Sequence, residues 1–194
     1  MLNVPGQLLV EVLKEGFAAL ALAVNGIDKL FAGLSVAERT QIKYFITNSN
    51  YDIREGYPNQ PGKVPMFSVV LGSEQETEQP IGGTIEDAEE EDGFDEEYGT
   101  WMQGTYMILC MADNANVVAW MHALVKYLLL ANRSLLDEFG YVNQRLAAGD
   151  LQPDAQYQPP YTFTRIAQWT ATYLESYVET YGKVSGVNIT VEAY

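Results

Sequence analysis

The segment Tyr161 to Tyr173 shows the strictest pattern in the chain, because its side chains alternate in character with a period of two. Such alternation is typical of a strand that is buried on one face and solvated on the other, as in antiparallel sheets. The second face is mostly Thr and Gln. We therefore expect an antiparallel or mixed sheet. The first face reads Tyr161, Phe163, Arg165, Ala167, Trp169, Ala171 and Tyr173.

Two helices are expected before the first strand. Apolar residues recur every three or four positions over 9–31, which places them on one helical stripe. Pro5 suits the start of this helix, because its missing N–H would be unpaired there in any case. Ser35 and Glu38 form a capping-box pattern, which favours a second helix at 36–47. The first helix is expected to break at its weak point, Asn25-Gly26.

Several further strands are indicated by β-branched and aromatic residues between turn-forming segments. We expect strands at 51–54, 65–71 and 101–111, the last of them buried on both faces because it is almost continuously apolar. Alternation at 187–191 predicts another strand near the C-terminus. Periodicity alone leaves 42–46 open to a strand as well as to a helix.

A long apolar helix separates the predicted strands. Asp113 or Asn114 is expected to cap its N-terminus, its apolar stripe covers 117–135, and Gly140 is expected to end it. Strands before and after such a helix predict an α+β fold, with a mixed or antiparallel sheet and helices packed on one face. The length of 194 residues suits a single domain.

An acidic run is the outlier in composition. Residues 86–97 hold nine acidic residues and no basic one, and without them the net charge of −15 would be −6. Like charges at this density resist compaction, so we expect a mobile surface loop at about 84–98. The spacing does not fit an EF-hand, so a solvated run is favoured over a cation site. The acidic residues are Glu86, Asp87, Glu89, Glu90, Glu91, Asp92, Asp95, Glu96 and Glu97.

Residues that commonly act as catalytic nucleophiles or bases are scarce, because the chain has one histidine and one cysteine. His122 lies in the apolar helix without a patterned partner, and Cys110 lies in an apolar strand, so both are interpreted as structural. Glycine-rich phosphate-binding fingerprints are absent, and the spacing of Asp150 and Asp154 supports no carboxylate pair. We expect no enzyme activity, no cofactor and no metal.

The charge balance and the N-terminal sequence restrict partners and location. A strongly acidic chain is poorly suited to sequence-specific contact with nucleic-acid phosphates. The start lacks a charged signal-peptide region, and the apolar stretch at 17–27 is too short to span a bilayer. We expect no membrane contact, and residence in a cytoplasm or in an assembly formed there.

Segments spread over most of the chain support a family resemblance. They are Gly56-Tyr57-Pro58, Val64 to Leu71, Glu74, Ile81-Gly82-Gly83, Gly104 to Ile108, Asn116 to Leu130, Asp150 to Pro153 and Tyr161 to Arg165. In their order along the chain and in their local sequences they resemble the tail-terminator and neck (head–tail completion) proteins of tailed bacteriophages. The acidic run has no counterpart that we can assign in that family.

The resemblance implies a structural virion protein in the neck or tail, assembled in the host cytoplasm. It implies a homohexameric ring at the head-proximal end of the tail tube, which ends tube growth and joins the head connector. The implied partners are other copies of the chain, tail tube and sheath proteins, and connector proteins. DNA would pass through such a ring without specific binding.

The aromatic face of the 161–173 strand is the predicted interface, because arginine among aromatic residues is a common composition of interface anchors. In the competing interpretation, Phe163 and Trp169 pack beneath the helix at 116–139. A second function also stays open, an acidic monomeric adaptor or inhibitor whose acidic loop docks on a basic partner. The predicted interface residues are Tyr161, Phe163, Arg165, Trp169 and Tyr173.

Overall fold

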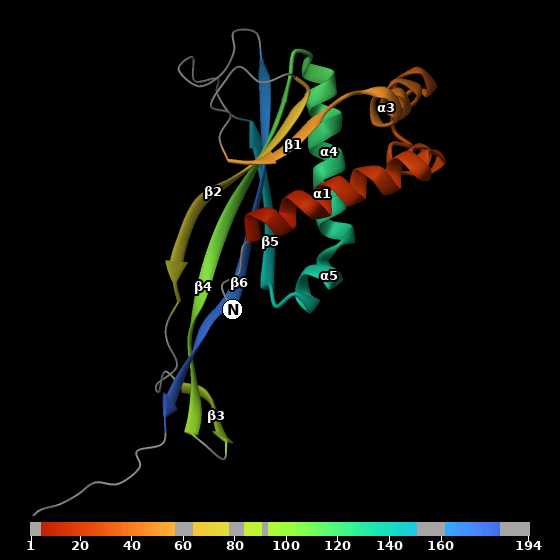
Figure 1. Ribbon diagram of the computed structural model, residues 1–194. Coiled ribbons are helices and arrows are strands. Elements are labelled where there is room, and N and C mark those ends of the chain that lie inside the picture. The colour runs from red at the N-terminus through yellow and green to blue at the C-terminus, as the bar shows by residue number, and fades with distance from the viewer. Residues whose placement is uncertain (1–4, 57–63, 78–83, 91–92, 151–161, 183–194) are drawn as a thin grey trace, which may run out of the picture. The chain divides into compact units, whose positions relative to one another are not determined.

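The computed structural model describes residues 5–56, 64–77, 84–90, 93–150 and 162–182 (Figure 1). Contacts within the chain group the residues into two compact units, where the sequence suggested a single domain. The larger unit comprises residues 4–75 and 103–173, and the smaller comprises 1–3, 76–102 and 174–194. Each unit is described separately. The strand expected at 187–191 lies outside the described residues.

The larger unit begins with the two expected helices. α1 spans Pro5–Leu22 and α3 spans Val36–Asn48, which excludes a strand at 42–46. The expected break is confirmed by the short 3-10 turn η1 (Val24–Gly26), which leads into α2 (Ile27–Leu30).

The capping box of α3 is also confirmed. The backbone N–H of Glu38 donates to Ser35 Oγ at 3.2 Å, and the Ser35 N–H donates to the Glu38 carboxylate at 2.9 Å. The Ser35 hydroxyl also donates to the Glu38 carboxylate, at 2.7 Å. This bond and the bond from the Ser35 N–H hold the pKa of Glu38 below its usual value, because both donors favour the ionised carboxylate.

A mixed sheet forms the other layer of the larger unit. Its strand order is β1-β2-β4-β6-β5. β1 is parallel to β2, β5 is antiparallel to β6, and β4 runs opposite to its neighbours β2 and β6 (Figure 1). The helices lie on one side of this sheet (Figure 1), which confirms the predicted α+β class. The strands are β1 (Asp52–Glu55), β2 (Met66–Glu76), β4 (Gly93–Ala112), β5 (Val142–Asp150) and β6 (Phe163–Gly182).

The expected apolar helix is confirmed as α4 (Ala115–Ala131), but it ends earlier than predicted. Asn114 caps it by accepting bonds from the backbone N–H groups of residues 116 and 117. At the other end, Asn132 Nδ2 donates to the Leu128 carbonyl at 2.8 Å. A side chain that bonds to the backbone in this way competes with the helix, so the chain turns and restarts as α5 (Arg133–Glu138). The prediction of one unbroken helix was therefore wrong, but Gly140 does end the helical segment, because it follows the C-cap of α5 with a φ of +86°.

The core of the larger unit lies on both faces of the sheet. On the helical side, the Phe17 ring lies 4.8 Å from Phe67 and 5.1 Å from Tyr51, measured between centroids. A second apolar cluster on β2 and β4 consists of Met66, Val70, Leu109 and Met111. Residues 108–112 are buried at every position, as expected for a strand covered on both faces.

The smaller unit contains the acidic run, and the backbone there forms a hairpin rather than the expected loop. β3 (Thr84–Glu90) pairs antiparallel with the first part of β4, with Glu86 opposite Glu97 and Asp87 opposite Glu96. Like charges opposite each other cost about 0.2–1 kcal/mol per pair, which backbone pairing can offset. Charge density alone was therefore a poor guide to backbone structure here. The mobility of the segment stays a prediction.

Candidate functional site

The aromatic face of β6 turns toward the helices, so it is largely internal. Trp169 is 2% exposed and Tyr173 is fully buried. Trp169 packs against Tyr106 and Tyr141 at ring-centroid distances of 6.2 and 5.7 Å, and its indole N–H donates to Gln144 Oε1 at 3.3 Å. Trp169 and Tyr173 therefore belong to the core, and their prediction as interface residues is corrected. For Trp169 the competing interpretation of a buried residue was right.

Tyr173 links three strands of the sheet. From β6, its hydroxyl donates to a carboxylate oxygen of Glu74 on β2, across the intervening β4. Gly104 on β4 leaves room for this crossing, because a Cβ there would lie 3.0 Å from Tyr173 Cε1 and Oη and 3.1 Å from Tyr106 Cε2. Burial raises the pKa of Tyr106 to about 12 and raises that of Tyr173 as well. Both phenols stay neutral near pH 7, so the cluster is a structural network.

The remaining predicted interface residues lie near the start of β6. Phe163 is 49% exposed, which contradicts its burial beneath a helix. Arg165 is partly exposed, and its Nε lies 2.9 Å from Asp150 Oδ1 on β5, the residue opposite it in the ladder. Tyr161 lies outside the described residues. The surface that remains for an interface is therefore Phe163, Arg165 and Asp150, which we call the Arg165 surface.

His122 and Cys110 lie in the interior. His122 is buried on α4, where its Nε2–H donates to the Ile166 carbonyl at 3.1 Å. Desolvation lowers the pKa of His122, and the nearby Lys126 lowers it further. Cys110 is fully buried on β4, and burial raises the pKa of its thiol. His122 is therefore held as the neutral imidazole and Cys110 as the thiol.

Two kinds of site can be checked within the described part of the chain. No group of three or more His, Cys, Asp or Glu side chains there is arranged to hold a metal ion. Among the helices of those residues, none combines the length and the apolar character that a bilayer-spanning segment needs. Asp150 is paired with Arg165, and Asp154 lies outside the described residues.

The acidic hairpin and the edge strand β5 complete the candidate surfaces. The hairpin register places acidic residues opposite each other at 86/97 and 87/96. β5 was missed from the sequence, because its mostly exposed residues show no alternation. Ala147, Ala148 and Gly149 in its C-terminal half are small, a feature that by itself indicates no strand.

Together, these features define an α+β protein with helices on one side of a mixed sheet and an acidic hairpin. Comparison with models of known protein families finds no match, and comparison with curated protein sequences finds none either.

Proposed function

We propose that this protein is a tail terminator of a tailed bacteriophage, a structural protein that forms a homohexameric ring at the head-proximal end of the tail tube. There it ends tube growth and joins the head connector. The observation behind the proposal is that, within the described residues, the longer segments resembling this family lie in the sheet and in its covering helix. They include parts of β2, β4 and α4 that carry buried core residues, and the start of β6.

The charge of the chain supports the proposal. A ring through which DNA slides must not hold the phosphates, and a net charge of −15 repels them. In the proposed ring, DNA passes without specific binding.

The Arg165 surface is the proposed contact with a neighbouring subunit or with a tail protein. Phe163 offers exposed aromatic area beside Arg165, whose guanidinium is oriented by Asp150. An aromatic residue next to an oriented arginine is a favourable composition for an interface anchor.

Complementation tests this contact. A lysate that lacks the protein is supplied with wild-type chain, with Arg165→Glu, or with Arg133→Glu as the matched control on α5. The wild type and Arg133→Glu should join heads to tails, whereas Arg165→Glu should fold but fail to join them. Full joining by Arg165→Glu would exclude this surface from the assembly contact.

The proposed terminator performs no chemistry, so its histidine and cysteine should be dispensable. His122→Gln and Cys110→Ala should each preserve joining as long as circular dichroism shows that the variant folds. Loss of joining in a folded and assembled variant would contradict a purely structural function.

A second candidate function is favoured by the hairpin register. The acidic pairs 86/97 and 87/96 repel each other, and this repulsion is relieved when a basic surface docks on the hairpin, as in an acidic adaptor or inhibitor. Neutralising Glu86, Asp87, Glu96 and Glu97 to their amides distinguishes the two functions. An adaptor should lose its activity, whereas the proposed terminator should keep it.

A further inference from the structure

β5 leaves one edge of the sheet open along nine residues. No described strand pairs with its outer side, and its residues are exposed apart from two of intermediate burial. An edge strand offers a row of backbone N–H and C=O groups that can pair with another chain. The opposite edge strand, β1, has only four residues, so β5 is the longer of the two open edges.

The side chains of β5 alternate between the two faces of the sheet from Arg145 onward. Leu146 lies opposite Trp169 in the ladder with β6, and Trp169 lies on the helical face. Residues that are opposite each other in a sheet share a face, so Leu146 and Ala148 also lie on the helical face. Arg145 and Ala147 lie on the other face.

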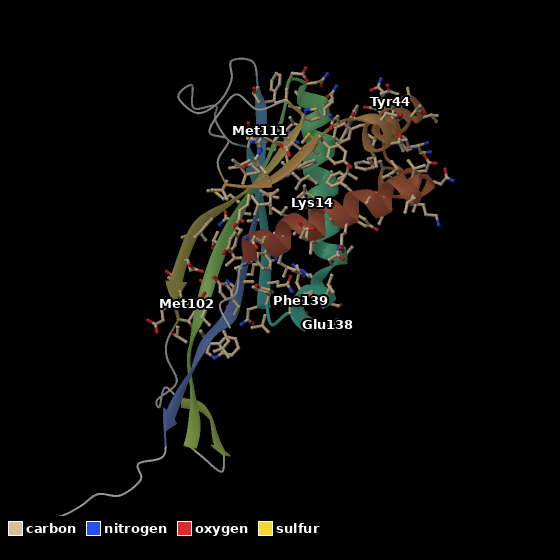
Figure 2. The ribbon with its side chains drawn as sticks, in the orientation of Figure 1. Lys14, Tyr44, Met102, Met111, Glu138 and Phe139 are labelled. Atoms are coloured by element: carbon tan, nitrogen blue, oxygen red, sulfur yellow. The ribbon has the colours of Figure 1, made fainter. Side chains whose placement is uncertain are left out.

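The helical face beside this edge has apolar area left uncovered. α5 packs against β5, because Gln144 Nε2 donates to the Arg133 carbonyl at 2.9 Å and to Asp137 Oδ1 at 2.8 Å. Leu135 of α5 is nevertheless exposed, and Phe139 at its C-cap, labelled in Figure 2, is 55% exposed. A strand added to β5 should therefore be apolar on its helical face and polar on the other.

A segment with this pattern follows β6 in the sequence. At 187–191 two valines and an isoleucine alternate with Asn188 and Thr190, which is the alternation that predicted a strand there. The segment lies outside the described residues. Its sequence matches the need of the β5 edge for one apolar and one polar face.

The segment cannot reach β5 of its own chain. Thr172 lies opposite the first residue of β5, and β6 continues for ten residues from Thr172 to Gly182, about 33 Å along the strand. The five residues from Gly182 to Val187 span at most about 18 Å. The occupant of the edge must therefore come from a second copy.

We propose that residues 187–191 of a second copy add to β5 as an antiparallel strand, with the apolar side chains on the helical face. The contact joins two different surfaces of the chain, so its repetition builds a ring or a filament. It goes beyond the proposed terminator function, because it requires neither a tail tube nor a connector and is tested on the purified protein.

The register follows from the rule that opposite residues share a face. With Ile189 of the second copy opposite Ala148, a large apolar side chain on the helical face meets a small one. The same register places Glu192 of the second copy opposite Arg145 on the other face, so opposite charges meet. Arg145 is exposed and therefore accessible for this contact.

Disulfide trapping tests the register. Single-cysteine substitutions are prepared in separate proteins, with the fully buried Cys110 unchanged. Ala148→Cys mixed with Ile189→Cys should form crosslinked dimers, and so should Ala147→Cys mixed with Thr190→Cys. The crossed mixtures, 148 with 190 and 147 with 189, should form far fewer, because their side chains project from opposite faces.

A charge placed on either face of the segment tests its orientation. Ile189→Asp should weaken self-association at least about tenfold in sedimentation equilibrium, because the aspartate replaces an apolar side chain that the contact buries. Thr190→Asp is the matched control. It adds the same charge one residue away on the exposed face, and it should associate nearly as the wild type does.

Four results would overturn the proposal. The first is a strict monomer at all concentrations in sedimentation. The second is crosslinking of the crossed mixtures that equals that of the matched ones. The third is Ile189→Asp associating as tightly as Thr190→Asp. The fourth is crosslinking within monomers of a double variant, Ala148→Cys with Ile189→Cys, which would show that the chain covers its own edge.

Discussion

Adding one methyl group at Gly104 should destabilise the larger unit. In Gly104→Ala the new Cβ would lie 3.0 Å from two atoms of Tyr173 and 3.1 Å from Tyr106. Tyr173 cannot easily move away, because it is fully buried, lies 5.4 Å from the Tyr141 ring and donates to Glu74. The added atom must therefore displace packed aromatic rings or the backbone of β4.

The expected magnitude follows from two opposing effects. Overpacking of a filled core costs about 1–3 kcal/mol. Replacing Gly by Ala returns about 0.4–1 kcal/mol, because the unfolded chain loses freedom. The net loss should be about 1–2 kcal/mol, and at about 2–4 °C per kcal/mol for a chain of this size the melting temperature should fall by about 2–8 °C.

Thermal unfolding followed by circular dichroism measures this effect. Gly33→Ala is the control, because a Cβ there meets nothing within 4 Å. In a Tyr173→Leu background Gly104→Ala should cost much less, since the ring that it meets is gone. The reasoning is refuted if Gly104→Ala melts at or above the wild-type temperature, or if its cost is the same in the Tyr173→Leu background.

Three further perturbations test local features. Because the pKa of His122 is lowered in the folded protein, the unfolded residue binds a proton more readily below pH 6.5. The free energy of unfolding of the wild type should therefore fall relative to that of His122→Gln as the pH drops. Urea unfolding of both proteins over a pH series measures this, and an equal pH dependence in the two proteins would contradict it. Ser35→Ala should cost about 1 kcal/mol in urea unfolding by removing the cap of α3, and an unchanged midpoint would show that the cap is dispensable. Deleting 86–97 should change the melting temperature little, whereas a large drop would show that the hairpin supports the fold.

Local signals in the sequence predicted much of the fold. The Ser35–Glu38 capping box and Asn114 mark helix starts through bonds made within a few residues, so both could be read directly. β6 was predicted because one of its faces is buried, which leaves a period of two in the sequence. β5 is an exposed edge strand held by pairing with β6, and exposure leaves no such period. The hairpin depends on backbone pairing, which a count of charges cannot indicate.

The candidate site was harder to predict than the fold. Alternation in β6 shows that two faces differ, but it does not show whether the aromatic face meets the helices of the same chain or another subunit. Trp169 packs against Tyr106 and Tyr141, and Tyr173 packs against Tyr141, whereas Phe163 is the first residue of β6 and stays exposed. Tyr141 and Gln144 complete the contacts of Trp169. Tyr141 directly precedes β5 and Gln144 belongs to it, and β5 is the strand that the sequence did not reveal. Figure 2 shows the side chains of the described residues around these strands.

The length of phage tails formed without this protein tests the terminator function most directly. Electron micrographs of a lysate that lacks the protein should show tails that exceed the normal length or remain unattached to heads, and adding purified protein should restore uniform, joined tails. Tails of normal length on full heads in the unsupplemented lysate would contradict the proposed function.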